Sequence, residues 1–223
     1  MALHHNPRVV TSGLILALDA GDVNSYPGSG TSWYDLSPSS LGATLTNGAA
    51  YSSNNSGVIY FDTTDDYAAI GSSNAFAFGT GDFALDVWIY PTQLSNTYTH
   101  MLALPDQGTF ALKAEVNTGN IYFYSPAFTT YGSTSGWTLT QNAWNHVVLV
   151  RASSVAYAYL NGEAKGSKSG FTNSFSAQVL NIHNGWSGEF AEAYMGPIKI
   201  YNRALSPAEI LQNFNATKSR FIP

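Results

Sequence analysis

The chain has 223 residues, no cysteine and a formal net charge of −5 at pH 7. The missing cysteines exclude disulfides and thiolate metal sites, and nine Lys and Arg residues without a basic cluster argue against nucleic-acid binding. No apolar run approaches the roughly 18 residues that cross a bilayer, so we expect no membrane insertion. A chain of this length fits one domain, and 10% charged residues together with abundant Gly, Ser, Thr, Asn and Tyr indicate a turn-rich β protein.

The N-terminal half predicts short strands separated by turns. Residues 1–12 are expected to form an arm, and Gly13–Asp19 is an apolar run with the length of a buried strand. Val58–Phe61 and Tyr67–Ile70 are further strand-like runs on the two sides of an acidic loop. The run Asp82–Pro91 alternates with a period of two, which predicts a strand that ends where proline lacks an N–H.

The C-terminal half continues this pattern and adds one helix. The expected strands are Phe110–Val116, Asn120–Tyr124, Val147–Arg151, Val155–Leu160, Val179–His183, Glu189–Met195 and Ile198–Tyr201. The run Val155–Leu160 is followed by Asn161-Gly162, which is a strong signal for a two-residue hairpin turn. Ser206-Pro207-Ala208-Glu209 is a capping box, which predicts a helix that ends near Lys218. Many strands with one helix indicate a sandwich or barrel.

Four blocks of the sequence resemble, in order, the motifs of the laminin-G-like, concanavalin A-type jelly-roll family. The blocks are Ile59–Tyr67, Asp82–Pro91, Trp144–Gly162 and Ile198–Ser206. The resemblance implies an all-β, antiparallel jelly-roll β-sandwich over residues 13–205, with a C-terminal helix and tail at 206–223 packed on it or extending from it. The sequence departs from the family at Thr63, where glycine is frequent, and at Gly196-Pro197, where an acidic pair is usual.

The flanking segments resemble a narrower group, the laminin-G-like proteins of tailed-bacteriophage particles. These segments are His4–Arg8, Gly13–Gly21, Ser25–Ser37 and Gln212–Phe221. The resemblance implies a non-enzymatic virion protein that decorates the capsid or is associated with the tail. It implies contacts with other virion proteins through residues 1–12 and 218–223, and cell-surface polysaccharide as a further ligand. The N-terminus lacks the pattern of a signal peptide, in agreement with synthesis in the host cytoplasm.

Two other functions stay open. The first is a carbohydrate-binding, lectin-like module of a secreted or surface protein of a bacterium. The second is a glycoside hydrolase, because one branch of the fold consists of glucanases.

The glucanase motif Glu-x-Asp-x-x-Glu is absent. Asp82 and Asp86 share a strand face, but at about 3.3 Å per residue they lie about 13 Å apart, too far for a retaining pair. We therefore expect no enzymatic activity.

Aromatic and polar residues in loops are the candidate glycan-binding groups, because sugars present an apolar face beside a rim of hydroxyls. The candidates are His183, Asn184, Trp186, Glu189 and Tyr131. Aromatic side chains also pack under loops and at protein interfaces, so a structural role is the alternative.

Three aspartates between two expected strands are the candidate metal ligands. Asp62, Asp65 and Asp66 cluster there, and calcium prefers several hard oxygen ligands. The sequence therefore predicts Ca²⁺ at this loop, with a weak Kd on the order of 10⁻⁴ M. The alternative is that Asp62 caps a turn while the other two face solvent. We expect no other cofactor.

Overall fold

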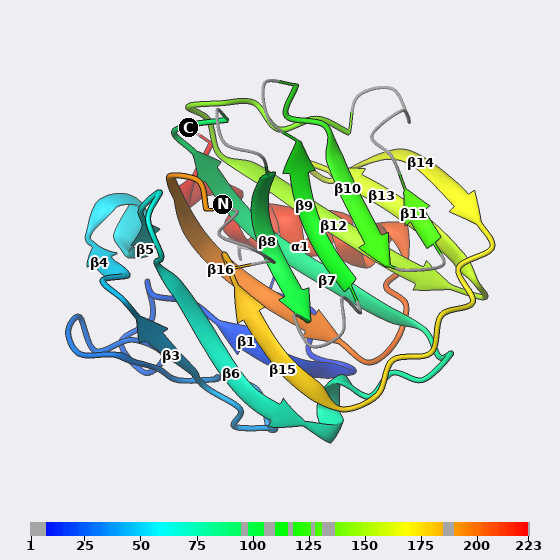
Figure 1. Ribbon diagram of the computed structural model, residues 1–223, viewed down its shortest axis with the longest axis horizontal. Coiled ribbons are helices and arrows are strands. Elements are labelled where there is room, and N and C mark those ends of the chain that lie inside the picture. Colours follow the sequence, from blue (N-terminus) through cyan, green and yellow to red (C-terminus); the bar gives the residue numbers. More distant parts are fainter. Residues whose placement is uncertain are drawn as a thin grey trace, which may run out of the picture.

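The computed structural model describes residues 8–94, 98–104, 110–115, 118–125, 128–130, 137–184 and 190–222. Within these residues, two antiparallel sheets of eight strands each face one another (Figure 1). Sheet A contains, in spatial order, β14 (Glu163–Ser169), β13 (Val155–Leu160), β12 (Asn145–Ala152), β7 (Phe83–Pro91), β16 (Ala193–Tyr201), β5 (Val58–Phe61) and β4 (Ala50–Ser52), with β1 (Leu14–Leu18) also on β16. Sheet B contains β11 (Phe128–Thr130), β10 (Ile121–Ser125), β9 (Phe110–Glu115), β8 (Tyr98–Leu104), β15 (Gln178–Ile182), β6 (Tyr67–Ser73), β3 (Ala43–Thr46) and β2 (Ser32–Trp33).

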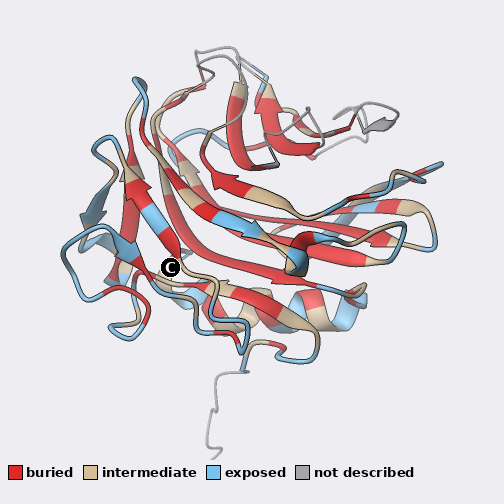
Figure 2. Ribbon diagram, turned by 60° about the horizontal axis from the view of Figure 1, so that its bottom comes forward, coloured by how far each residue is buried: buried red, intermediate tan, exposed pale blue. Residues whose placement is uncertain are grey.

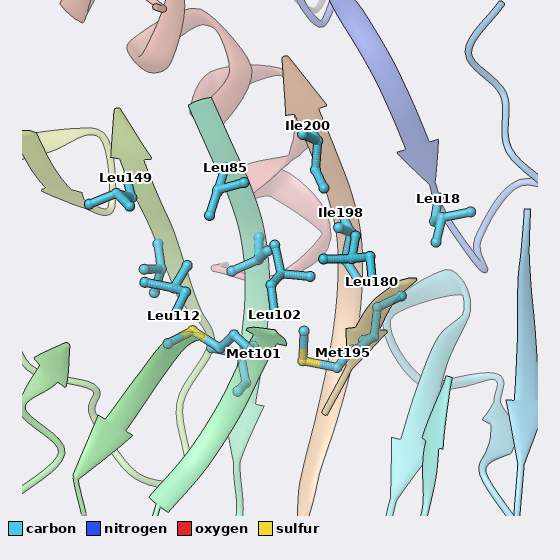
Figure 3. Packing of buried hydrophobic residues seen from close by; sticks show 14 of the residues in the cluster. Leu18, Leu85, Met101, Leu102, Leu112, Leu149, Leu180, Met195, Ile198 and Ile200 are labelled. Atoms are coloured by element: carbon cyan, nitrogen blue, oxygen red, sulfur yellow. The ribbon is translucent and has the colours of Figure 1, made fainter. Parts of the chain in front are cut away.

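The main hydrophobic core lies between the two sheets. In β7 the predicted alternation places Leu85, Val87 and Ile89 in this core. Figure 3 shows such side chains of sheet A directed toward Leu102, Leu112 and others of sheet B. The sandwich architecture predicted from the sequence is thus confirmed.

The outer face of sheet A is covered by the helix α1 (Pro207–Thr217) and the short 3₁₀ helix η4 (Lys218–Arg220). The predicted capping box is present, since the Ser206 and Glu209 side chains each bond the other's backbone N–H. Ile210 of α1 packs in a second cluster with Ala84 of β7 and Tyr201 of β16. Strand β7 is therefore buried on both faces, and Figure 2 shows that strands at the edges of the sheets carry intermediate and exposed residues as well. Among the described residues, no helix is long and apolar enough to span a membrane.

A buried polar network joins α1 to sheet A. Asp86 Oδ1 lies 3.0 Å from His146 Nε2 and 3.4 Å from Lys199 Nζ, while Oδ2 accepts a hydrogen bond from Asn213 Nδ2 at 2.8 Å. Burial opposes ionisation of Asp86, but the charge of Lys199 and the bonds from His146 and Asn213 hold its pKa well below the usual range. The network fixes the position of α1, because each buried polar group depends on the others.

The two chain ends pack on this same domain, where the sequence predicted arms that contact other proteins. Val10 N donates to Asn213 Oδ1 at 2.8 Å, and Tyr201 Oη donates to Val10 O at 3.0 Å. Phe221 is only 5% exposed and stacks on Trp88 with the ring centroids 4.7 Å apart. Residues 8–12 and 218–222 therefore pack on their own sandwich, which is one of the two arrangements expected for the C-terminal tail, and their contacts with virion proteins stay a prediction; residues 1–7 and 223 lie outside the described residues.

One long strand, β16, replaces the two strands predicted around Gly196-Pro197. Its register shifts between Met195 and Ile198, at the Gly196-Pro197 position where the sequence departs from the motif it resembles. A Cβ on Gly196 would lie 2.9 Å from Trp88 Cβ and 3.1 Å from Phe221 Cζ. A side chain at position 196 would therefore clash with Trp88 of β7 and crowd the Phe221 ring. The remaining short helices are η1 (Asn54–Ser56) and η2 (Asn74–Phe76).

Candidate functional site

The loop predicted to bind glycans is described only in part. His183 is fully buried, its ring stacks on Phe61 at a centroid distance of 4.8 Å, and its Nε2 bonds Ala191 O. Burial lowers the pKa of His183 to about 4, so its ring is neutral at pH 7. The prediction that this ring contacts a sugar is wrong, because the side chain faces the protein interior. Asn184 is half-buried at the surface. Trp186, Glu189 and Tyr131 lie outside the described residues, and their role stays a prediction.

The three predicted calcium ligands do come together in the β5–β6 loop. One carboxylate oxygen from each of Asp62, Asp65 and Asp66 lies within 4.8 Å of the others. Asp62 Oδ1 accepts a hydrogen bond from Thr64 N at 2.8 Å, which lowers the pKa of that carboxyl. This bond is the turn cap that the alternative interpretation expected for Asp62.

Asp66 differs from that alternative, because it is 2% exposed and does not face solvent. Its Oδ2 accepts from Asp62 N at 3.0 Å, but its buried Oδ1 has no hydrogen-bond partner. Burial and the nearby charges of Asp62 and Asp65 raise the pKa of Asp66. A buried carboxylate oxygen without a donor, beside two further carboxylates, fits a hard divalent cation such as calcium.

A pocket of about 340 Å³ lies on the outer face of sheet A, and we call it the Trp144 pocket. It is lined by Asn54, Asn55, Tyr90, Thr92, Asn142, Trp144 and Tyr194. Its volume falls within the range of about 300–1,000 Å³ that is usual for small-molecule sites. None of these lining residues was among the site residues predicted from the sequence.

Strand periodicity places the aromatic wall of the Trp144 pocket. In β7 and β16, Ile89 and Met195 enter the core, so the neighbouring Tyr90 and Tyr194 point outward. The Tyr90 ring lies 5.6 Å from the Trp144 ring and 6.1 Å from the Tyr194 ring, between centroids. The first contact is tilted and the second is edge-on, and the three rings together give a half-buried aromatic surface.

Polar groups complete the wall and fix its geometry. Trp144 Nε1 donates to Asn55 Oδ1 at 3.1 Å, and Asn55 Nδ2 donates to Arg220 O at 2.7 Å. These bonds hold the indole ring and connect it to the C-terminal segment. Asn54 and Asn142 are exposed at the rim, and no hydrogen bond from the described residues engages their side-chain amides. The pocket therefore offers an aromatic surface beside amide groups that are ready to bond a ligand.

The carboxylates considered for glycosidase chemistry are engaged elsewhere. Asp86 lies fully buried under α1 in the network described above. Asp82 Oδ1 accepts a hydrogen bond from Ser153 N at 2.9 Å, at the opposite end of β7 from the Trp144 pocket. Asp82 and Asp86 therefore have different hydrogen-bond partners in different parts of the domain, and they do not share one site.

Comparison with known proteins decides the family. Residues 62–211 match the model of the concanavalin A-like lectin/glucanases superfamily, Laminin_G_3. The chain belongs to this superfamily. The match covers most of the sandwich and part of α1, and it confirms the laminin-G-like resemblance of the four sequence blocks. No curated protein matches the chain.

Solved structures with the same fold include parts of toxins and of an enzyme. The binding domain of Paraclostridial Mosquitocidal Protein 1 has a TM-score of 0.72 at 15% identity, over 92% of this chain and 52% of that one. The binding domain of botulinum neurotoxin serotype D has a TM-score of 0.71 at 14% identity, over 92% and 52%. Trypanosoma rangeli sialidase has a TM-score of 0.72 at 17% identity, over 96% of this chain and 34% of the enzyme. This chain thus spans about half or less of these proteins, and the likeness concerns the fold.

Proposed function

We propose that the domain binds carbohydrate without catalysing a reaction on it, and that the Trp144 pocket is the binding site. The observation that carries the proposal is the pairing of the Tyr90–Trp144 aromatic wall with rim amides at Asn54 and Asn142. The C–H face of a sugar stacks on aromatic rings, while its hydroxyls need groups that both donate and accept hydrogen bonds. Membership of a lectin and glucanase superfamily supports the same function.

The absence of a carboxylate from the pocket lining supports a binding role without catalysis. Glycoside hydrolysis by the usual route needs two carboxyl groups, about 5–9.5 Å apart, on the two sides of the scissile bond. Within the part of the chain that the structure describes, no Asp or Glu lines the Trp144 pocket. A sugar that enters this pocket is therefore held among aromatic rings and neutral polar groups.

A matched pair of tryptophan variants tests the proposal. Trp144→Phe removes the Nε1 bond to Asn55 but keeps a ring against Phe221. Trp88→Phe removes a similar bond, from Trp88 Nε1 to Thr217 Oγ1 at 2.9 Å, in the protein interior. On a glycan array, we expect Trp144→Phe to weaken binding about tenfold and Trp88→Phe to leave affinity unchanged. Equal affinity of all three proteins for a bound glycan would exclude the Trp144 pocket as its site.

We propose further that the domain serves on a bacteriophage particle, as a capsid-decorating or tail-associated protein that contacts host-surface polysaccharide. The resemblance of its flanking segments to phage proteins supports this role. Residues 8–12 and 218–222 pack on their own sandwich but keep exposed residues such as Arg8 and Lys218, through which virion contacts are proposed. Mass spectrometry of purified particles tests the proposal, whose alternative is a lectin-like module of a secreted or surface protein of a bacterium.

Calcium binding at Asp62, Asp65 and Asp66 is a separate proposal. The buried, unpartnered Oδ1 of Asp66 supports it, because a cation would supply the missing partner. A metal there would neutralise the repulsion among the three carboxylates and stiffen the β5–β6 loop.

A further inference from the structure

We propose that the Trp144 pocket selects neutral sugars and discriminates against glycans that carry carboxylate or sulfate groups. This inference rests on the carbohydrate-binding function proposed above and names the class of sugar. It follows from the charges around the pocket, which lack any cation that an anionic sugar needs.

No basic side chain lines the pocket. All nine Lys and Arg residues of the chain belong to the described part, and none is among the lining residues. Proteins usually bind carboxylate and sulfate groups through Arg or Lys, because a charged donor roughly doubles the strength of the hydrogen bond. An anionic sugar would lose its hydration in this pocket without gaining a counter-charge.

Arg220 contacts the pocket wall from behind, but its guanidinium is already engaged. Its Nε donates to Asn55 O at 3.2 Å, its Nη1 donates to Asp19 Oδ2 at 2.7 Å and its Nη2 donates to Gly57 O at 3.0 Å. All three nitrogens thus serve the fold, and the paired Asp19 carboxylate balances the charge. Arg220 would have to break these bonds before it could bind a ligand.

An acidic residue, and not a basic one, adjoins the other side of the pocket. Glu192 contacts the pocket residue Thr92, whose Oγ1 donates to Glu192 O at 2.9 Å. The Glu192 Oε1 accepts a hydrogen bond from Tyr60 Oη at 2.8 Å, and the Tyr60 ring lies 5.1 Å from that of Tyr194. Burial and the bond to Glu192 raise the pKa of Tyr60 to about 12, so the phenol stays protonated. Glu192 thus offers a ligand carboxylate no counter-charge on this side of the pocket.

The groups that do face the ligand match neutral hydroxyls. The amides of Asn54 and Asn142 each offer donors and an acceptor, as a sugar hydroxyl does. The chain's net charge of −5 adds a long-range repulsion against polyanionic glycans. Short-range and long-range electrostatics thus favour the same class of sugar.

The test is a glycan array of the intact domain in which each neutral oligosaccharide is paired with its sialylated, uronic acid or sulfated counterpart. We expect neutral members to bind and each added anionic group to weaken binding at least about tenfold. Affinity for the neutral members should not change between low and high salt, because no ligand charge is screened. The variant Asn54→Lys, which adds a cation at the exposed rim, should reduce the discrimination.

The outcomes separate this inference from the function on which it rests. Binding of no glycan at all would show that the proposed carbohydrate function is wrong, and the inference with it. Preference for anionic members, lost on Trp144→Phe, would overturn the inference while the function stands. Preference for neutral members that survives Trp144→Phe and ignores Asn54→Lys would place the selectivity outside this pocket and overturn the inference as well.

Discussion

His146 Nε2 lies 3.0 Å from Asp86 Oδ1, and neither side chain is exposed to solvent. These two residues lie on the adjacent strands β12 and β7, where His146 is opposite Trp88 and Asp86 is opposite Val148, and Asn213 of α1 bonds Asp86 from above. Together with Lys199 they form a buried polar centre between sheet A and the helix.

Removing the Asp86 carboxylate should destabilise the domain strongly. In Asp86→Ala, the 5% exposed Lys199 loses its counter-charge and Asn213 Nδ2 loses an acceptor. Breaking a buried pair in this way costs about 3–5 kcal/mol of unfolding free energy, measurable by urea denaturation. The control is Glu163→Ala, whose exposed bond to Lys165 is worth about 1 kcal/mol or less. Similar costs for the two variants would contradict the role of Asp86.

Acid should destabilise the domain in part through His183. Its folded pKa of about 4 is below the value of about 6.5 in an unfolded chain. Between these values the unfolded state binds more protons, so the free energy of unfolding falls as the pH is lowered from 7 to 4. The single group contributes on the order of 3 kcal/mol to this fall.

The variant His183→Asn isolates that contribution, because asparagine tolerates the backbone φ of 67° and does not titrate in this range. Its unfolding free energy should depend less steeply on pH between 4 and 7 than that of the wild type. Parallel pH profiles would mean that His183 is accessible to protons in the folded state. The two proteins are compared by the slope of unfolding free energy against pH, so a loss of stability that is the same at every pH does not affect the result.

Calcium should raise the melting temperature of the domain, and a chelator should lower it. At a free calcium concentration about 100 times the Kd, binding adds about 2.7 kcal/mol to the unfolding free energy. Asp66→Asn should abolish the response, because it removes the charge of the buried ligand. Asp22→Asn is the control, since Asp22 caps another turn through Asn24 N. The absence of any calcium-dependent shift in the wild type would exclude a structural calcium.

The C-terminal segment should behave as part of the fold. Phe221→Ala removes a buried ring that contacts Trp88 and Trp144, and should cost about 3 kcal/mol or more in urea denaturation. The neighbouring Ile222 is 38% exposed, so Ile222→Ala should cost about 0.5 kcal/mol or less. If neither variant changed stability, the segment would act as a free tail in solution.

Features that depend on near neighbours in the chain were predictable. The capping box at Ser206 and Glu209 formed, and the period of two in β7 placed Leu85, Val87 and Ile89 in the core. The acidic cluster was also visible, because Asp62, Asp65 and Asp66 share one short loop. The burial of Asp66 was not predictable from the sequence, because it depends on packing across the β5–β6 loop and on Gly48 from a different turn.

The Trp144 pocket was not predictable in the same way. Its residues come from η1, the ends of β7 and β16, and the turn before β12, which are far apart in the sequence. The only local signal was the outward parity of Tyr90, which equally fits an aromatic packed on a sheet face. The predicted sugar contact of His183 was wrong for a similar reason. The residues that follow His183 indicate a loop, whereas tertiary packing buries its ring.

The sequence by itself determined the fold class, since strand periodicity, turn residues and helix caps act within a few residues of the chain. Only the tertiary structure decided where a ligand can bind. Antiparallel pairing brings distant segments together, and the C-terminal segment covers Trp88 while leaving Tyr90 and Trp144 half-exposed. The exposure of a side chain depends on every element that packs around it, so it is decided only when the whole chain has folded.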